Sequence, residues 1–278
     1  MNRRNFSALL SSSLFGLSSL DSLKLNNINA KKYKISLAQW SLHKAITSGK
    51  TSPVGFAKKA RDLGFDAIEY VSSLYTERSG YLKLNSMAKL TKELNSEADE
   101  YGIKNLLIMI SGEGDLSSSN KKKNSHAVDN HKKWIDLANA IGCQSVRVDL
   151  NGEKNLNRWK NNSIKSLELL CGYSGNLNIL VENHGGFSSN SEHLADVIRT
   201  VNLDNCGTLP DFGNFCINGS PNPANLNVCK KWYDKYAGIN DLMPFAKALS
   251  AKSYDFLDNG DEKYIDYYKM MRIVNNHP

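Results

Sequence analysis

The sequence predicts an α/β fold, a (β/α)8 TIM barrel without its eighth βα unit. Short apolar runs that fit buried parallel strands alternate with amphipathic helical segments along the chain. Strands that alternate with helices in this way imply right-handed parallel units. Seven such units cover about 245 residues, close to the roughly 250 residues usual for an eight-unit barrel.

Each predicted strand is a short apolar run bounded by polar or turn-forming residues. The strands lie at residues 34–40, 66–71, 104–110, 145–150, 177–182, 206–211 and 247–254.

The helices between them have recognisable end signals. Pro53 lies in the first turn of one helix and Gly64 just past its end, Gly102 closes the next, and Ser191 is a plausible N-cap. The predicted helices lie at residues 53–63, 86–101, 126–141, 158–171, 191–201, 227–236 and 261–274, with one further turn at 240–245. A Gly-, Ser- and Lys-rich loop is expected at 111–125, and a Pro- and Asn-rich loop at 220–226.

Composition limits the possible functions. The chain has 278 residues, a formal net charge of +7 and 41% hydrophobic residues, which fits one large soluble α/β domain, or less well two small ones. Its Lys and Arg residues are scattered, so nucleic-acid binding is not expected, whereas acidic small substrates remain compatible. The cysteines show no CxxC spacing, which argues against a disulfide framework or a zinc cluster. They are Cys143, Cys171, Cys206, Cys216 and Cys229.

Residues 1–30 are predicted to be an export signal, followed by the barrel at 31–278. Arg3 and Arg4 precede Phe6, and an apolar, Ser-rich run follows before a weak cleavage site near Ala30. The paired arginines resemble a twin-arginine signal, which predicts an exported bacterial protein, periplasmic or extracellular. The alternative is a plain amphipathic or disordered leader. The apolar run is too short for a membrane span, so no stable membrane anchor is expected.

Polar residues follow two of the predicted strands at the point where each strand ends. Glu182, Asn183 and His184 follow the apolar run at 179–181, and Asp211 ends the next strand, with Asn214 just beyond. Ligands bind at the carboxyl ends of parallel strands in α/β folds. Two carboxylates at the same rim suggest a divalent metal site.

Several segments resemble the xylose-isomerase-like sugar phosphate isomerase/epimerase superfamily, in particular its exported branch with twin-arginine leaders. They are ISLAQWSLHKA, FDAIEYV, SVRVDL, ILVENHGG, LPDFGN and AKSYDFLDNGDEKYIDY, and the resemblance covers residues 34–274. It implies that Glu182 and Asp211 bind Mn²⁺, Mg²⁺, Co²⁺ or Zn²⁺. The family's third ligand is a His in a His-x-Lys-Asp-like pattern. Aligning its Lys with Lys252 puts Ser250 at the position of that His.

The family's fourth ligand is a Glu on the eighth strand, and the chain ends before that strand. The sequence is therefore expected to be C-terminally incomplete, poorly stable and inactive as written. Only two of the family's four ligands have counterparts here.

The resemblance implies a metal-dependent sugar or sugar phosphate isomerase or epimerase that moves a proton beside a carbonyl. Glu182 is the expected base, and Lys252 is a hypothetical partner for the oxyanion. Two alternatives stay open: a non-catalytic carbohydrate-binding barrel, because Ser250 replaces a ligand, and an abasic-site endonuclease, whose fold the superfamily shares.

Other residues are candidates for contacts with a small sugar or sugar derivative. Each has a structural alternative, such as core packing, an ion pair or a backbone contact. The predicted substrate-binding residues are Trp40, His43, Glu69, Arg147, His184 and Asn214. His126 and His131 are expected on the surface, and an oligomer is possible.

Overall fold

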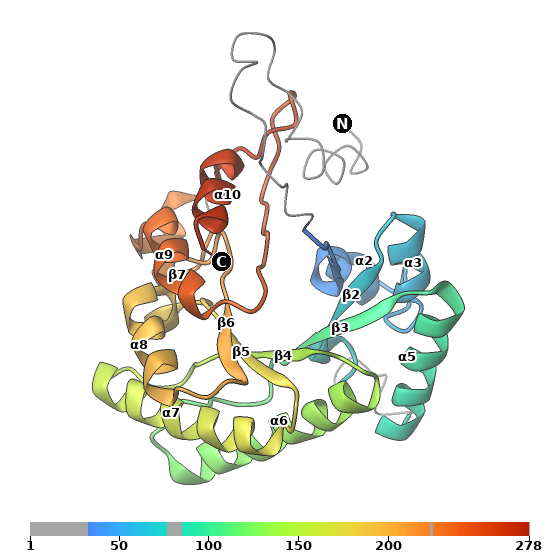
Figure 1. The fold of residues 1–278 in the computed structure, drawn as a ribbon, viewed down its shortest axis with the longest axis horizontal. Coiled ribbons are helices and arrows are strands. Elements are labelled where there is room, and N and C mark those ends of the chain that lie inside the picture. The colour runs from blue at the N-terminus through green and yellow to red at the C-terminus, as the bar shows by residue number, and fades with distance from the viewer. Residues whose placement is uncertain (1–32, 77–84, 223–224, 278) are drawn as a thin grey trace.

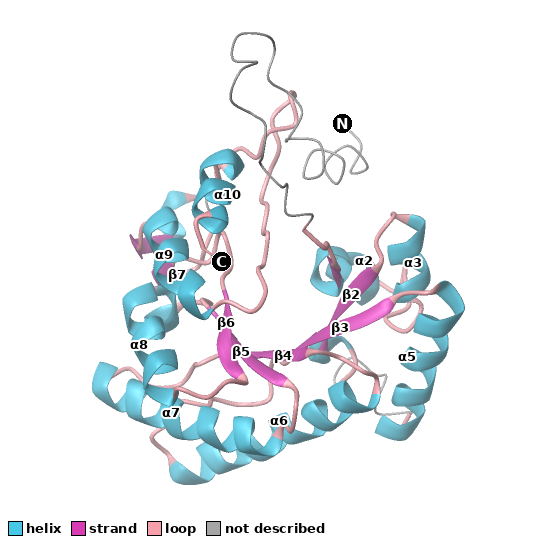
Figure 2. Ribbon diagram, in the orientation of Figure 1, coloured by secondary structure: helices cyan, strands magenta, loops and turns pink. Residues whose placement is uncertain are grey.

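Six parallel strands form the centre of the molecule, and helices are arranged along their outer side (Figures 1 and 2). The structure is a computed structural model that describes residues 33–76, 85–222 and 225–277. The leader predicted at 1–30 lies outside the described residues. The strands pair in chain order and are Leu37–Ala38 (β1), Ala67–Val71 (β2), Lys104–Met109 (β3), Ser145–Val148 (β4), Asn178–Glu182 (β5) and Cys206–Leu209 (β6). The predicted TIM-barrel-like architecture is confirmed.

Side-chain caps fix where most of the longer helices begin. Asn120 accepts a hydrogen bond from the Lys123 N–H, so its helix begins five residues earlier than predicted. Asn190, rather than the predicted Ser191, caps the helix at 191–201. The α-helices are His43–Thr47 (α2), Phe56–Asp62 (α3), Met87–Tyr101 (α5), Lys121–Ala140 (α6), Leu156–Tyr173 (α7), Ser191–Val201 (α8), Lys235–Leu242 (α9) and Tyr267–Asn275 (α10). Short 3₁₀ turns are Gln39–Leu42 (η1), Ser72–Leu74 (η2), Gly186–Ser189 (η4), Leu226–Val228 (η5) and Met243–Phe245 (η6).

Three leucines from the strands form a buried cluster of their own, separate from the core between the strands and the helices. Leu107 of β3, Leu180 of β5 and Leu209 of β6 are buried in one cluster, and Ala248 packs against it. The larger core between strands and helices includes the fully buried Trp134 and Trp159. Strands buried on both faces read as continuous apolar runs, which is why the sequence located them well.

The last third of the chain departs from the prediction in two places. The expected strand at 247–254 is reduced to one isolated parallel bridge, Asp211↔Ser250, which keeps this segment beside β6. The expected helix at 261–274 begins only at Tyr267, because Glu262 accepts backbone N–H groups from the preceding loop, among them those of Tyr254 and Tyr264. The hydrogen bonds to Glu262 stabilise a non-helical backbone conformation in the residues before Tyr267.

The predicted helix at 227–236 is wrong, and the cysteines, expected to form no disulfide framework, include one bonded pair. Cys216–Gly219 (β7) pairs antiparallel with Cys229–Trp232 (β8), and Cys216 is disulfide-bonded to Cys229. Helix α9 follows only at Lys235. The spacing of 13 residues shows no motif in sequence, and only the two-stranded pairing brings the two cysteines together. The other three cysteines are free.

Removal of this disulfide should destabilise the protein. For a loop of this size, cross-linking the unfolded chain contributes about 3 kcal/mol. We expect the double variant Cys216→Ser/Cys229→Ser to lose about 2–3 kcal/mol of unfolding free energy in urea, whereas Cys143→Ser, at a free cysteine, serves as the matched control. Alkylation of Cys216 and Cys229 in unfolded, non-reduced protein would contradict the pairing.

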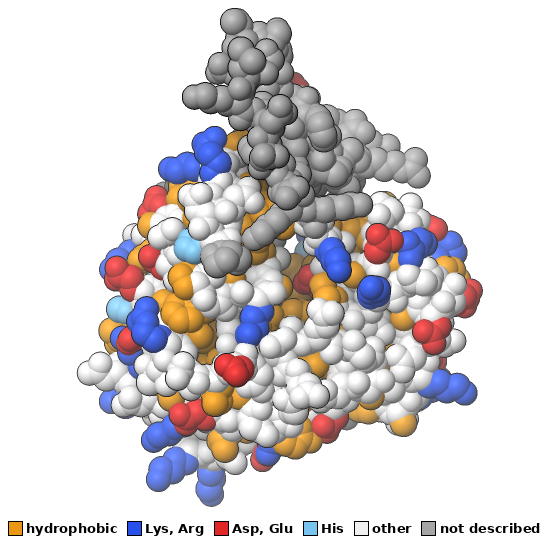
Figure 3. Space-filling view, viewed as in Figure 1, with side chains coloured by type: hydrophobic (Ala, Val, Ile, Leu, Met, Phe, Trp, Pro, Cys, Tyr) orange, Lys and Arg blue, Asp and Glu red, His pale blue; other side chains and the backbone are white. Residues whose placement is uncertain are grey.

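No helix among the described residues is long and apolar enough to cross a membrane. Basic and acidic side chains are interspersed over the face shown in Figure 3, without a continuous patch of one sign.

Candidate active site

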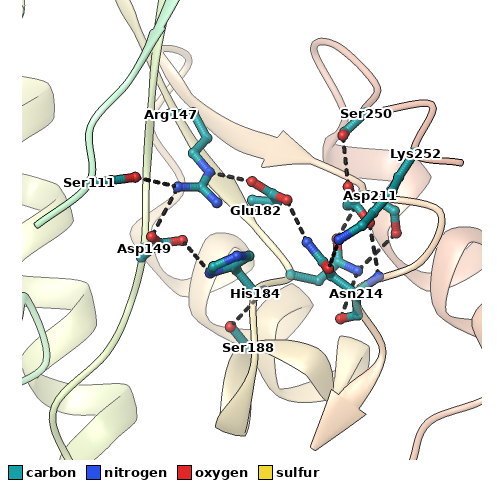
Figure 4. A network of polar contacts seen from close by, with 11 residues as sticks. Ser111, Arg147, Asp149, Glu182, His184, Ser188, Asp211, Asn214, Ser250 and Lys252 are labelled. Carbon is teal, nitrogen blue, oxygen red and sulfur yellow. Dashed lines mark hydrogen bonds and ion pairs between the residues drawn. The ribbon is translucent and has the colours of Figure 1, made fainter. Parts of the chain in front are cut away.

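The carboxyl ends of β4, β5 and β6 bring together a cluster of charged and amide side chains (Figure 4). Arg147 lies on β4, Glu182 is the last residue of β5, and Asp211 follows β6. The three side chains are almost fully buried, with 2–3% of each residue exposed. Charges at this depth need partners, because desolvation disfavours an isolated ion.

Arg147 links two of the carboxylates. Its Nε donates to Glu182 Oε2, and its Nη1 donates to Asp149 Oδ2 at 2.9 Å. Alternate residues of a strand point to the same face, so Arg147 and Asp149 both face the cluster. The guanidinium also lies 3.5 Å from the Ser111 hydroxyl at the end of β3. A fixed cation is therefore shared between β4 and β5.

Asn214 connects Glu182 to the last segment of the chain. Its Nδ2 donates to Glu182 Oε1 at 2.7 Å, and its Oδ1 accepts from Lys252 Nζ at 2.6 Å. Figure 4 shows the Lys252 side chain reaching toward Asn214 and Asp211. The predicted residues Glu182, Asn214 and Lys252 thus form one hydrogen-bonded chain.

Asp211 is held by three hydrogen bonds. Its Oδ1 accepts two backbone N–H groups, from Gly213 and Asn214, each at 2.8 Å, and its Oδ2 accepts the Ser250 hydroxyl at 2.7 Å. A side chain at Gly213 would collide with the Tyr254 ring, since a Cβ there would come within 2.6 Å of it. The glycine of the LPDFGN segment is thus required by close packing.

The two buried carboxylates have opposite pKa shifts. Burial alone would raise the pKa of Glu182, but the charge of Arg147 and its hydrogen bond lower it overall. Burial, and then the charge of Glu182, raise the pKa of Asp211 to about 6. Environments that separate the pKa values of neighbouring acids are typical of proton-transfer sites. Arg147 thus favours the charged form of Glu182, whereas burial disfavours the charged form of Asp211.

The raised pKa of Asp211 predicts a pH-dependent stability difference. A proton held more tightly in the folded state stabilises it below pH 3.8, and this contribution is lost as pH rises through about 6. Asp211→Asn lacks this contribution. The stability advantage of the wild type over this variant should therefore shrink by about 1.4 kcal/mol between pH 5 and pH 8. Urea unfolding of both proteins across this range measures it, and a constant difference would contradict the shift.

His184 is the most exposed side chain of the cluster. Its side chain is 46% exposed, and its Nδ1 lies 3.4 Å from Asp149 Oδ1, a buried oxygen with no hydrogen-bond partner. Gly185 adopts a positive φ of 87°, which lets the chain turn sharply after β5. Asp149 can orient the imidazole so that Nε2 faces outward.

A cavity of about 290 Å³ adjoins this side of the cluster. Asp149, Glu113, Asp115 and the buried His131 are among its lining residues. His131 Nδ1 donates to the Ala127 carbonyl at 2.7 Å, and burial lowers its pKa. The prediction that His131 is a surface residue is wrong.

Sequence reasoning missed the cavity, although part of its pattern is local. His131 follows Ala127 by four residues and precedes Trp134 by three, and both neighbours are fully buried. This spacing is typical of the inward face of a helix. Glu113 accepts from Trp134 Nε1 at 2.6 Å and pairs with Lys133 at 2.9 Å, contacts that depend on the course of the loop after β3.

Six predicted site residues come together in the cluster: Arg147, Glu182, His184, Asp211, Asn214 and Lys252.

Three other predicted residues lie apart from the cluster: Glu69 on β2, Trp40 in η1 and His43 at the start of α2. Glu69 accepts from the Ser36 hydroxyl, and burial and the charge of Glu182 raise its pKa, although the Ser36 hydrogen bond opposes this. Trp40 and His43 stack on each other with ring centroids 4.2 Å apart. Their contact with a sugar stays a prediction.

The donor set does not fit a divalent metal ion. Glu182 and Asp211 are adjacent as predicted, but each of their four carboxylate oxygens already accepts a hydrogen bond from the protein. Within the described part of the chain, no group of three or more His, Cys, Asp or Glu side chains could hold a metal ion. Ser250 donates to Asp211 where the resemblance implies a ligand, and Lys252 adds a positive charge.

A family model described as "Xylose isomerase-like TIM barrel" matches residues 57–278. No curated protein matches the chain in sequence. Solved structures match its fold at low identity. A 3-keto-D-glucoside 4-epimerase from E. coli is 11% identical, with a TM-score of 0.63 over 89% of both chains. A D-psicose 3-epimerase studied in the presence of D-fructose is 12% identical, with a TM-score of 0.62 over 88% of this chain and 81% of that one.

A further match is a xylose isomerase-like TIM barrel protein from Mycobacterium smegmatis in complex with magnesium. It is 18% identical, with a TM-score of 0.55 over 82% of this chain and 80% of that one. At these identities the likeness shows the fold alone.

Proposed function

Because the chain belongs to the xylose isomerase-like TIM barrel family, we propose that it is a sugar isomerase or epimerase that moves a proton at a carbon beside a carbonyl. The observation that carries the proposal is the buried Glu182 at the end of β5, paired with Arg147 and hydrogen-bonded through Asn214 to Lys252. A base beside a fixed positive charge is what enolate formation requires. The epimerases among the structural matches support this reaction class.

In the proposed reaction, Glu182 removes the proton and Lys252 stabilises the oxygen of the resulting enediolate. Arg147 and Asn214 together use two of the four acceptor positions of the Glu182 carboxylate, so positions remain for the substrate proton. His184, oriented by Asp149, is the second proton carrier and can return a proton from the solvent side. An epimerase needs such a second group on the opposite face of the carbon.

We propose an unphosphorylated sugar as the substrate. Carboxylates, a neutral imidazole and an amide line the cavity beside Asp149, and its lining residues include no Lys or Arg. Such a surface accepts hydrogen bonds from hydroxyl groups and repels phosphate. The cavity therefore favours a neutral sugar over a sugar phosphate.

We also propose that the protein acts outside the cytoplasm, in a bacterial periplasm or extracellularly. The paired arginines in the first residues support export. The Cys216–Cys229 disulfide independently supports an oxidising compartment, because such bonds are rare where thiols are kept reduced.

The test is hydrogen exchange in D₂O. The full-length chain is incubated with D-fructose, D-psicose, a 3-keto-D-glucoside and their phosphorylated counterparts, and NMR follows deuterium at carbons beside the carbonyl. We expect exchange and a new isomer with at least one unphosphorylated sugar. Binding without exchange would instead support a carbohydrate-binding barrel, and exchange restricted to sugar phosphates would overturn the proposed substrate class.

A further inference from the structure

We propose that the Lys252 ammonium is the built-in cation of this site, and that the site binds no divalent metal ion. The inference deepens the proposed function, on which its catalytic meaning rests, but its test does not require turnover. Glu182 and Asp211 at the same rim suggest a metal site, but the contacts that these two carboxylates make do not fit one.

Glu182 already has a positive partner, and a second positive charge lies nearby. Arg147 pairs with Glu182 from the β4 side, and Lys252 approaches from the segment beside β6. Asn214 lies between Glu182 and Lys252, and its backbone N–H donates to Asp211. A divalent ion placed here would meet two fixed cations, and it would have to share carboxylate oxygens that already accept hydrogen bonds from the protein.

Lys252 is held in place by its own segment and by α10. Its backbone N–H donates to the Ser250 carbonyl at 2.8 Å, and the Tyr267 hydroxyl lies 2.8 Å from its carbonyl oxygen. Its ammonium lies 5.2 Å from the centre of the Tyr254 ring, a cation–π arrangement. A positive charge fixed in this way needs little reorganisation to meet a developing oxyanion.

Ser250 completes the substitution. Its hydroxyl donates to Asp211 Oδ2 at 2.7 Å, so it occupies one acceptor position of that oxygen and supplies no imidazole ligand. The bridge Asp211↔Ser250 holds the two residues in this register. Ser250 thus lacks the imidazole of the implied ligand and also forms a hydrogen bond with the carboxylate of Asp211.

The first experiment measures metal directly. The full-length chain is treated with EDTA, dialysed against Mn²⁺, Mg²⁺, Co²⁺ or Zn²⁺, and analysed for metal content and Tm. We expect no stoichiometric metal and no rise in Tm, because a ligand that binds only the folded state would raise it. One equivalent of metal per chain that is lost in Asp211→Asn would overturn the proposal.

The second experiment asks whether Lys252 is what excludes the metal. Ser250→His introduces an imidazole ligand and keeps the Lys252 ammonium. Ser250→His/Lys252→Ala introduces the same ligand and removes the ammonium. Ser250→His/Lys263→Ala is the matched control, since Lys263 is an exposed lysine paired with Asp255. We expect Co²⁺ to bind at least about tenfold more tightly to the first double variant than to the other two proteins.

Equal Co²⁺ affinity in all three, including no binding by any, would overturn the role assigned to the Lys252 charge. These measurements are independent of the sugar assay. Failure of the proposed function would appear as absent exchange with every sugar, whereas failure of this inference would appear as bound metal.

Discussion

Replacing Glu182 with glutamine should reduce deuterium incorporation into the product epimer by about a thousandfold or more, within the range for loss of a general base. The amide has nearly the same shape but cannot accept the proton as a carboxylate does. Exchange is measured by NMR in D₂O for both proteins under saturating sugar. Glu168→Gln, which makes the same change at an exposed position on α7, should leave the rate unchanged.

Folding must be checked in the same sample, because Glu182 also anchors Arg147 and Asn214. Near-ultraviolet circular dichroism and the Tm report whether the packing persists. A well-folded Glu182→Gln protein with wild-type exchange would exclude Glu182 as the base and would leave His184 as the remaining candidate.

Replacing Arg147 with methionine should cost about 3–5 kcal/mol of unfolding free energy, as expected when one partner of a buried ion pair is removed. The side chains of Arg147 and Glu182 are only 2% and 4% exposed. Without Arg147, the Glu182 carboxylate would be left unpaired where water cannot solvate its charge. Urea unfolding of the wild type and the variant measures the loss.

The chain offers a matched control in a second Arg–Glu pair. Arg158 pairs with Glu153 at 3.1 Å, but the Arg158 side chain is 62% exposed. Arg158→Met should therefore cost much less than Arg147→Met, although the Glu153 side chain is 8% exposed, because water can reach the rest of this pair. The double variant Arg147→Met/Glu182→Gln should be more stable than Arg147→Met alone, because it removes one stranded charge. Equal losses at Arg147 and Arg158 would contradict the role given to burial.

The sequence located most of the sheet and both buried carboxylates because these features depend on local patterns. The apolar run before Glu182 and the small strand before Asp211 each end in polar residues, and parallel strands bring such ends to one rim. Both residues could thus be placed before any side-chain contact was known.

The contacts of these carboxylates could not be predicted in the same way. Arg147 is 35 residues from Glu182, and Ser250 is 39 residues from Asp211, so neither pairing leaves a local signal. The hairpin closed by Cys216 and the loop held by Glu262 were missed for the same reason. Strand and helix propensity in these segments is weaker than the tertiary contacts that decide their course.

The unequal exposure of Glu182 and His184 determines which epimer of the sugar should keep its hydrogen when the reaction runs in D₂O. Glu182 is 3% exposed, whereas the His184 side chain is 46% exposed. A proton taken by the shielded carboxylate returns to the same carbon before water replaces it, but one taken by the imidazole is exchanged. The unreacted epimer that faces Glu182 should therefore keep its hydrogen in D₂O, while the unreacted epimer that faces His184 accumulates deuterium.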